Sequence, residues 1–287
     1  MSAVTNARLD IVPEENNFGA CVRGLDSREA TSAVVEELRN ALLRYQVLCL
    51  RLRPLSAYEF DRVGRWFGEP QLQLLREHRH PECETVSVFD STYHEAKDKP
   101  QDLRLDRRSG WHTDDSYFET PAKITLLQAL AIPSRGGETK FCDARRAYQS
   151  LTKKFQDKIA GLQAVHSYDT KRAPARAVQR TAAEIADTPD VHHPLVRTHD
   201  ETGEKAIYFN SNRTDRIISL PRTESDALLD ELHAHMTAPE FQYHHQWEVG
   251  DILVWDNRSV THAVNMDFPI GERRIHQRLL LTGSRPV

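Results

Sequence analysis

Short apolar segments constrain the fold of this chain more than any other feature. Four of them cover residues 46–51, 124–132, 252–255 and 275–281, and each reads as a buried strand. Such strands dominate the middle and the end of the chain, whereas amphipathic helical patterns lie at the flanks. This order favours an α+β chain with a mainly β core, built as one antiparallel sandwich with helical insertions.

Helical segments are marked by apolar spacing and by capping residues. Residues 27–44 repeat apolar positions every three or four residues, which predicts an amphipathic helix. Ser56 and Glu59 form a capping-box pattern that opens a second helix. Asp143 is expected to cap a short helix, and a longer helix is expected at about 223–236.

Composition bounds the class of protein. The 287 residues include 38 basic and 42 acidic side chains, so the net charge of −4 gives no basic excess of the kind that marks nucleic-acid binding. No apolar run is long enough to span a membrane, and no signal peptide is visible at the N-terminus. The four cysteines show no paired CxxC spacing and are expected to be reduced thiols in a cytoplasmic protein.

The chain is expected to form one domain over residues 1–287. Two stretches, at residues 69–110 and 169–193, lack regular periodicity and are predicted to be loop insertions near an active site, apart from a short strand expected at residues 86–89. The sequence leaves the oligomeric state open, and a homo-oligomer is compatible with it.

A candidate metal site begins at the stretch Trp111-His112-Thr113-Asp114-Asp115. If this stretch is a β-strand, His112 and Asp114 point to the same face, and Thr113 points away. A third ligand, His262, follows the apolar strand that ends near Trp255. Two histidines and one carboxylate with open positions are the ligand set of non-haem Fe(II) oxygenases. The His-x-Asp pair is weak by itself, because 14 histidines and 42 acidic residues produce such pairs by chance.

The spacing of a larger set makes the pattern specific. Asp114 and Thr139 are separated by 24 residues (115–138), Thr139 and His262 by 122 (140–261), and His262 and Arg274 by 11 (263–273). This set resembles the signature of the TauD/TfdA family of Fe(II)- and 2-oxoglutarate-dependent dioxygenases. The resemblance extends over nearly the whole chain, through segments at 18–24, 45–51, 66–68, 111–121, 136–139, 196–199, 255–258 and 273–278.

The resemblance implies a fold, cofactors and a reaction. The fold would be the double-stranded β-helix, or jelly roll. His112, Asp114 and His262 would hold Fe(II), with 2-oxoglutarate and O2 as co-substrates. Arg274, helped by the Thr139 hydroxyl, would bind the distal carboxylate of 2-oxoglutarate. The reaction would oxidise a small substrate while 2-oxoglutarate is converted to succinate and CO2.

Three further residues bear on the substrate. In proteins similar to taurine dioxygenase, the arginine that matches Arg278 holds the anionic group of the substrate. Arg213 aligns loosely with an aromatic pocket residue of that enzyme, and Asp115 adjoins the ligand pair. A polar, amino-acid-derived metabolite would give Arg213 and Asp115 partners. A substrate of the taurine or aryloxyacetate type is the alternative, in which these two residues shape nothing.

Other classes of protein are weighed by the same residues. A zinc hydrolase could use the same three ligands, but it would not require Thr139 and Arg274 at this spacing. A non-enzymatic jelly-roll binding protein would not need a complete triad. A halogenase is disfavoured because Asp114 supplies the carboxylate that such relatives lose to make room for halide.

Overall fold

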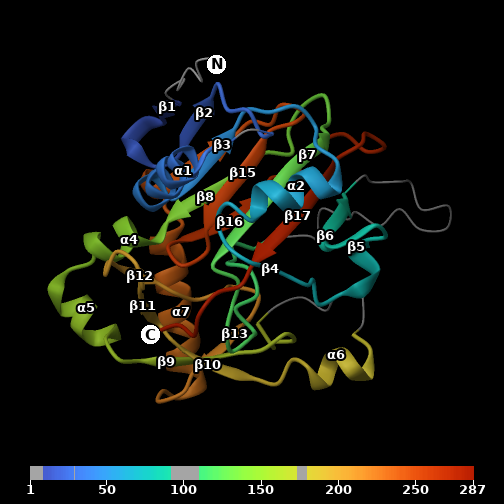
Figure 1. Cartoon of the computed structure of the whole chain (residues 1–287). Helices are drawn as coiled ribbons and strands as arrows, with labels where there is room; N and C mark the ends of the chain where they lie inside the picture. The colour runs from blue at the N-terminus through green and yellow to red at the C-terminus, as the bar shows by residue number, and fades with distance from the viewer. Residues whose placement is uncertain (1–8, 29, 92–109, 173–179) are drawn as a thin grey trace.

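The computed structural model describes residues 9–28, 30–91, 110–172 and 180–287. At its centre is a sheet of nine strands in the order β1-β2-β3-β15-β7-β17-β6-β5, with β4 paired to β17 (Figure 1). Every pair is antiparallel except β2–β3. The strands are β1 (Asp10–Pro13), β2 (Ala20–Arg23), β3 (Val47–Leu50), β4 (Pro70–Gln71), β5 (Arg79–His80), β6 (Cys83–Asp90), β7 (Ile124–Ala131), β15 (Ile252–Asp256) and β17 (Ile275–Leu281).

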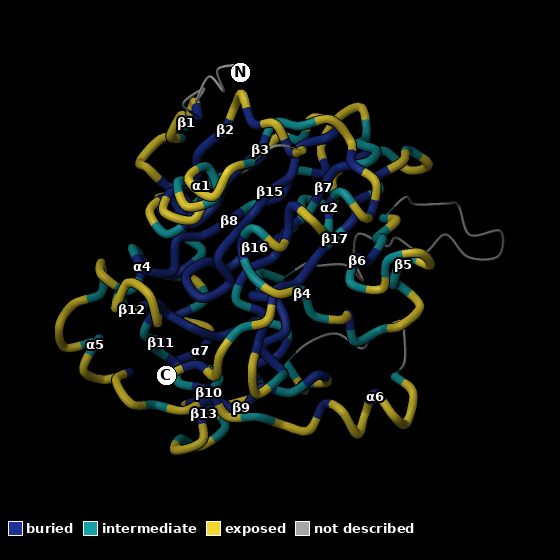
Figure 2. Tube along the Cα trace, in the orientation of Figure 1, coloured by how far each residue is buried: buried dark blue, intermediate teal, exposed yellow. Residues whose placement is uncertain are grey.

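A smaller sheet packs against one face of this main sheet. It contains three strands in the order β14-β8-β16, namely β14 (Gln242–His245), β8 (Thr139–Asp143) and β16 (Val260–Val264). The two sheets bury a shared apolar cluster that includes Val47 and Trp255 from the main sheet and Phe141 from β8. The space between the sheets is therefore a packed interior. In Figure 2 the central strands of both sheets are coloured as buried.

Helices α1 (Ser32–Tyr45) and α2 (Ala57–Gly64) cover the other face of the main sheet. Leu38 and Phe60 on these helices share an apolar cluster with strand residues such as Leu48 and Leu279. The predicted capping box is present, because Ser56 accepts from the Glu59 N–H while the Glu59 carboxylate accepts from the Ser56 N–H. The amphipathic pattern at 27–44 is confirmed as a helix, which begins later than predicted because Thr31 caps it.

A third apolar cluster lies under α7 (Arg222–Met236), the longest of the described helices. It includes residues of the outer strands β12 and β13, whose bounds follow. The remaining strands form one three-stranded and one two-stranded sheet. They are β9 (Gln163–His166), β10 (Val191–Pro194), β13 (Thr214–Ile217), β11 (Val196–Thr198) and β12 (Lys205–Ile207). The remaining helices are α4 (Ala144–Ser150), α5 (Lys153–Ile159), α6 (Ala182–Ala186), α7 (Arg222–Met236) and the 3-10 turns η1 (Glu15–Asn17), η2 (Arg76–His78) and η3 (Pro239–Phe241).

The two predicted loop insertions are partly regular. Residues 69–91 contain β4, η2, β5 and β6, and β6 pairs with the last strand β17. Residues 92–109 and 173–179 lie outside the described residues, whereas α6 and the start of β10 fall within the second insertion. The short strand predicted at residues 86–89 is present within β6, whereas β4, η2 and β5 were missed because elements of two or three residues leave no periodicity to detect.

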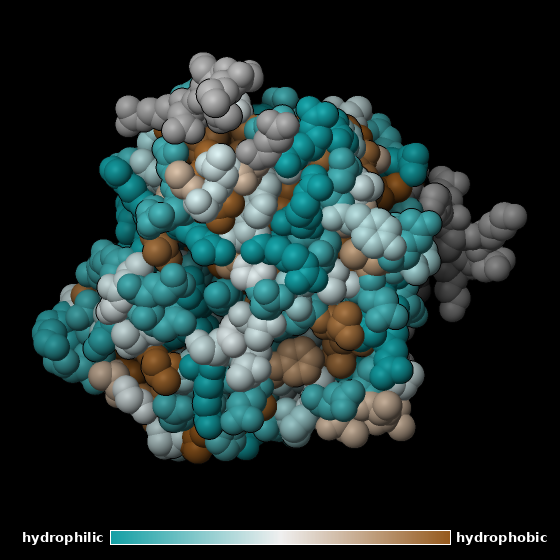
Figure 3. Space-filling model, in the orientation of Figure 1, coloured by the Kyte–Doolittle hydropathy of each residue, from teal (hydrophilic) through white to brown (hydrophobic). Residues whose placement is uncertain are grey.

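The surface mixes polar and apolar side chains. On the face drawn in Figure 3, hydrophobic side chains are scattered among hydrophilic ones. Within the described residues, no helix combines the length and the apolar character needed to cross a membrane.

Candidate active site

His112 and His262 are brought together by backbone pairing at the edge of the smaller sheet. The two residues form an antiparallel bridge, in which the His112 N–H donates to the His262 carbonyl at 2.9 Å and the reverse bond is 2.7 Å. Their ring centroids lie 4.1 Å apart. With the Asp114 carboxylate, one ligand atom from each of the three side chains falls within 4.8 Å of the others.

Asp114 reaches this point through a turn and not through a strand. Only His112 has a strand-like bridge, and the chain turns at Asp114 and Asp115. Asp115 adopts φ 55°, in the left-handed region that aspartate tolerates better than most residues. The strand predicted for this stretch is therefore wrong. The Thr113 side chain is buried, and its hydroxyl donates to the Asn257 carbonyl at 2.9 Å.

The carboxylate of Asp114 is buried and held by donors. The Thr125 hydroxyl donates to its Oδ2 at 2.7 Å, and Arg278 Nη1 donates to its Oδ1 at 3.4 Å. Burial by itself raises the pKa of Asp114, but the nearby His262 and Arg278 outweigh burial and hold that pKa below its usual value. The carboxylate is therefore ionised at neutral pH, which is the form that binds a metal.

His262 is kept neutral by its surroundings. Burial, reinforced by the neighbouring His112, lowers the pKa of His262 to about 3. Its ring packs 4.7 Å from the ring of Trp255, measured between centroids. His112 has its Nδ1 3.1 Å from the Gly110 carbonyl, so a proton on Nδ1 leaves Nε2 with its lone pair. Two imidazoles and one carboxylate thus converge, and this donor set fits a divalent transition metal.

Arg274 and Thr139 lie in the interior, in a group that also contains Trp247 and His276. Arg274 precedes β17, is 4% exposed, and its Nε donates to the Gly137 carbonyl at 3.2 Å. Thr139 opens β8 and accepts from Trp247 Nε1 at 3.1 Å. The Trp247 and His276 ring centroids are 4.6 Å apart. Burial, and then the charge of Arg274, lowers the pKa of His276 well below its usual value.

Because Gly137 has no side chain, the Arg274 side chain can lie close to the backbone at that position. Its φ of 73° is strained for a residue with a side chain. A Cβ at this position would also meet Arg274 Nε at 3.3 Å. The Arg274 side chain therefore lies directly against the backbone of the segment Ser134–Gly137.

The fold and the site geometry can be compared with known proteins. The family model of the taurine catabolism dioxygenase TauD, TfdA family matches residues 10–280. The alpha-ketoglutarate-dependent 2,4-dichlorophenoxyacetate dioxygenase of Cupriavidus pinatubonensis is 32% identical over 271 residues, covering 91% of this chain and 92% of that protein. The chain belongs to the TauD/TfdA family. The predicted family and the predicted enzyme class, a dioxygenase dependent on 2-oxoglutarate (alpha-ketoglutarate), are confirmed.

Two more relatives extend this comparison. The alpha-ketoglutarate-dependent sulfate ester dioxygenase of Pseudomonas putida is 30% identical over 293 residues, covering 97% of this chain and 91% of that protein. The crystal structure of AAD-2 in complex with Mn(II) and N-oxalylglycine superposes with a TM-score of 0.82 at 28% identity, covering 97% of this chain and 98% of that one. The sheet-rich core with flanking helices is thus shared with solved dioxygenase-type structures.

In this family member, Arg278 lies beside the candidate metal ligands. Besides Asp114, its guanidinium donates to Gln73 Oε1 at 2.6 Å and lies 4.4 Å from the centroid of the Phe89 ring. The His276 and Arg278 side chains point to the interior, whereas Gln277 points to the opposite face and donates to the Leu55 carbonyl. Side chains in this part of β17 therefore alternate between the two faces of the main sheet.

Asp115 and Arg213 have partners within the protein. Asp115 accepts from Gln71 Nε2 at 2.8 Å and from the Tyr117 hydroxyl at 3.0 Å. Burial is the main cause that raises the pKa of Asp115 to about 6. Arg213 donates to the Tyr168 carbonyl, and its guanidinium lies 4.2 Å from the Tyr168 ring centroid and 5.2 Å from that of Tyr117. The two residues do not pair with each other, and neither depends on a substrate for a partner.

Several residues that support the site were not singled out from the sequence. Thr125 donates to Asp114, Gln73 accepts from Arg278, and Trp247 donates to Thr139. Alternation along β7 could have placed Thr125 on the inner face, because Leu126 packs in the cluster under the helices. Gln73 carries no such signal, since it lies in a connection between short strands.

The turn between β15 and β16 precedes His262 in the chain and is held by buried ion pairs. Arg258 donates to both carboxylate oxygens of Asp256, at 2.8 and 2.7 Å, and His199 Nε2 lies 2.9 Å from Asp256 Oδ2. Burial alone would raise the pKa of Asp256, but its contacts with His199 and Arg258 lower that pKa strongly. Asp256 and Arg258 of the Trp-Asp-Asn-Arg segment therefore form a buried ion-pair network with His199. This network fixes the turn before β16, the strand that carries His262.

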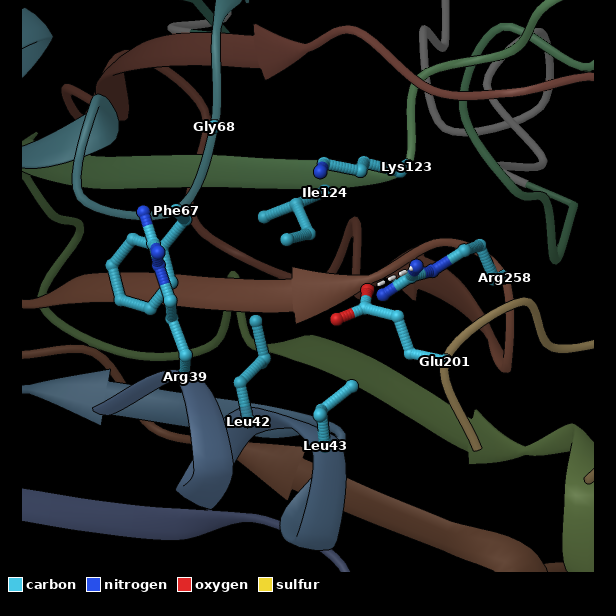
Figure 4. A pocket seen from close by; sticks show the side chains of 9 residues that line it. All are labelled: Arg39, Leu42, Leu43, Phe67, Gly68, Lys123, Ile124, Glu201 and Arg258. Atoms are coloured by element: carbon cyan, nitrogen blue, oxygen red, sulfur yellow. Dashed lines mark hydrogen bonds and ion pairs between the residues drawn. The ribbon is translucent and has the colours of Figure 1, made fainter. Parts of the chain in front are cut away.

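A surface cavity of about 190 Å³ lies away from these residues. Arg39 and Leu42 of α1 line it together with Lys123, and an ion pair between Glu201 and Arg258 closes one side (Figure 4). None of the candidate ligand or co-substrate residues lines this cavity. It is therefore separate from the candidate active site.

Proposed function

We propose that His112, Asp114 and His262 hold Fe(II) and that the chain is an Fe(II)- and 2-oxoglutarate-dependent dioxygenase of small anionic substrates. The observation that carries the proposal is the convergence of two imidazoles and one ionised carboxylate within 4.8 Å. Such a set leaves coordination positions open for 2-oxoglutarate and O2. When bound, the iron supplies the oxidation chemistry that couples 2-oxoglutarate decarboxylation to attack on the substrate.

The chain's own residues prepare this site before anything binds. Thr125 and Arg278 orient the Asp114 carboxylate and keep it charged. The bridge between His112 and His262 fixes the two imidazoles on one edge of the smaller sheet. Because these positions are set by backbone pairing and buried hydrogen bonds, little reorganisation is needed when a metal binds.

Arg274 is proposed to bind the distal carboxylate of 2-oxoglutarate. The guanidinium is buried, and its planar fork matches a carboxylate in a bidentate manner. The Thr139 hydroxyl already accepts from Trp247, so its own proton is available to donate to that carboxylate. The related AAD-2 structure contains Mn(II) together with the dicarboxylate N-oxalylglycine, which supports a metal next to a dicarboxylate pocket.

Arg278 is proposed to receive the anionic group of the substrate. Its guanidinium is next to Asp114, so an anion bound there would lie beside the metal. Relatives named for action on 2,4-dichlorophenoxyacetate and on sulfate esters support a carboxylate or sulfate as that group. The prediction of a polar amino-acid-derived substrate loses its argument from Asp115 and Arg213, because both have internal partners. Both substrate types remain proposals.

We also propose that the chain is one jelly-roll domain. The strands β6-β17-β7-β15 lie next to one another in the main sheet, and the His112 bridge extends β16-β8-β14 to four members. Two facing four-membered sheets are the arrangement of a jelly roll.

Succinate release tests the proposed function. The chain with Fe(II) and 2-oxoglutarate should release succinate in response to one or more members of a panel of carboxylates, sulfonates and sulfate esters. Asp114→Ala should abolish turnover while circular dichroism stays close to that of the parent, because one ligand is lost and the strands are not. Asp114→Ala protein that turns over at the parent rate would refute the iron assignment.

A further inference from the structure

A second group of metal-binding side chains lies inside the fold. Cys49 on β3, His245 on β14 and Asp251, just before β15, place one thiol, one imidazole nitrogen and one carboxylate oxygen within 4.8 Å of one another. All three residues are buried. Among the described residues, only this group and the proposed iron triad bring three such side chains together.

Cys21 adds a second thiol to this group. Cys21 on β2 and Cys49 on β3 are register partners in the parallel strand pair, so their side chains point to the same face. Cys21 is buried, as the other three residues are. The four side chains therefore come from β2 and β3 of the main sheet, from β14 of the smaller sheet and from the loop before β15.

The ring of His245 is already oriented as a metal ligand would be. Its Nδ1 lies 2.9 Å from the Tyr243 hydroxyl, and its Nε2 lies 3.9 Å from Cys49 Sγ and 3.1 Å from Asp251 Oδ2. With the proton on Nδ1 and donated to Tyr243, the Nε2 lone pair faces the thiol and the carboxylate. A hydrogen bond to the other ring nitrogen is the usual companion of a ligating histidine.

The charges of the group balance around a divalent ion. Arg51 donates to both oxygens of Asp251, at 2.9 and 2.8 Å, so these two charges already cancel. A divalent ion that displaces one proton from each of the two thiols leaves the total charge of the buried group unchanged.

We propose that Cys21, Cys49, His245 and Asp251 form a tetrahedral Zn(II) site that joins the two sheets. Thiolate sulfur and imidazole nitrogen are preferred zinc ligands in closed structural sites. The proposed iron triad contains no sulfur, so the two sites select different metals. Zn(II) would replace two thiol S–H bonds by two Zn–S bonds and release two protons.

Cobalt substitution tests this site in the full-length chain. The reduced, chelator-stripped protein is titrated with Co(II) alone, and thiolate-to-cobalt charge-transfer absorption reports sulfur ligation. The parent should show this absorption saturating within two equivalents, because the proposed iron triad also takes up Co(II), and Cys49→Ser should lose it. Cys142→Ser, which alters a buried cysteine on β8, should keep it. Asp114→Ala should also keep it, so that failure of this site and failure of the proposed iron site remain distinguishable.

A stability measurement covers the case in which Cys49→Ser folds poorly. Cys21→Ser changes the outer of the two strands and should weaken Co(II) binding at least tenfold. Excess Zn(II) should raise the Tm of Asp114→Ala by about 5 °C, but not that of the double variant Asp114→Ala with Cys21→Ser, in which neither proposed site is complete. The zinc site is overturned if the reduced parent shows no charge-transfer absorption, or if that absorption survives in both cysteine variants.

Discussion

Replacing Thr125 by valine should weaken metal binding without removing any proposed ligand. The Thr125 hydroxyl donates to Asp114 Oδ2 at 2.7 Å and accepts from Asn257 Nδ2 at 2.7 Å. Valine has nearly the same shape, so the packing of this fully buried side chain is kept. The substitution therefore removes the donor that orients the Asp114 carboxylate and helps to keep it ionised.

The expected magnitude follows from these two bonds. A hydrogen bond to a charged group is worth about 1.5–3 kcal/mol, and about 1.4 kcal/mol corresponds to a tenfold change in affinity. Loss of such a bond to a metal ligand should weaken metal binding by about 10- to 100-fold. The Asn257 amide also loses its acceptor, which should cost about 1–3 kcal/mol of folding stability. That cost is present with and without metal, so it cancels from the metal affinity.

A Mn(II) titration measures the affinity directly. Free Mn(II) is followed by its electron paramagnetic resonance signal in the metal-free parent, in Thr125→Val and in Thr125→Ser, and urea unfolding of each chain is measured without metal. Thr125→Ser keeps a hydroxyl and should bind Mn(II) like the parent to within about threefold. The reasoning is refuted if Thr125→Val binds Mn(II) as tightly as the parent, or if Thr125→Ser is as weak as Thr125→Val.

Two further predictions concern the co-substrate and pH. Arg274→Ala should raise the 2-oxoglutarate concentration needed for half-maximal succinate release by about tenfold or more, Thr139→Ala should raise it less, and the exposed neighbour Arg273 serves as the control on alanine substitution. An unchanged requirement in Arg274→Ala would show that another residue binds 2-oxoglutarate. Asp115 has a pKa raised from 3.8 to about 6, so its ionisation increasingly opposes folding as pH rises between these two values, and the effect levels off above pH 6. Asp115→Asn should therefore stabilise the protein by roughly 1–3 kcal/mol at pH 8, by about half as much at pH 5 and by little near pH 3.5, and equal effects on urea unfolding at pH 8 and pH 3.5 would contradict this.

Local sequence signals predicted local structure correctly. The Ser56–Glu59 capping box is formed, and Asp143 caps α4 by accepting from the N–H groups of Arg145 and Arg146. These motifs are contained within four residues, so no distant part of the chain can override them easily. The apolar segments at 46–51 and 252–255 became β3 and β15 because a continuous apolar run can be buried from both sides of a sheet.

Contacts between distant segments could not be predicted in this way. Gln73 reaches Arg278, and Gln71 reaches Asp115, from short strands and turns that carry no hydrophobic period. The internal partners of Arg213 are two tyrosines, and nothing in the residues around Arg213 identifies them. Because Arg213 and Asp115 both have partners within the protein, they do not require a polar substrate. A buried charge needs a partner, but the sequence does not say whether that partner is the protein or the substrate.

The turn at Asp114 shows why the triad could be recognised from the sequence although its local structure was predicted wrongly. Strand alternation was one way to bring His112 and Asp114 to a common point, and the left-handed turn at Asp115 is another. What fixes the geometry is the other side of the site, where the Asn257 carbonyl accepts from Thr113 and its side-chain oxygen lies 3.4 Å from the Asp114 N–H. Asn257 follows Asp256, whose ion pair with Arg258 is fully buried. The position of Asp114 therefore depends on a turn far along the chain, and disruption of that turn should displace the first two ligands as well as the third.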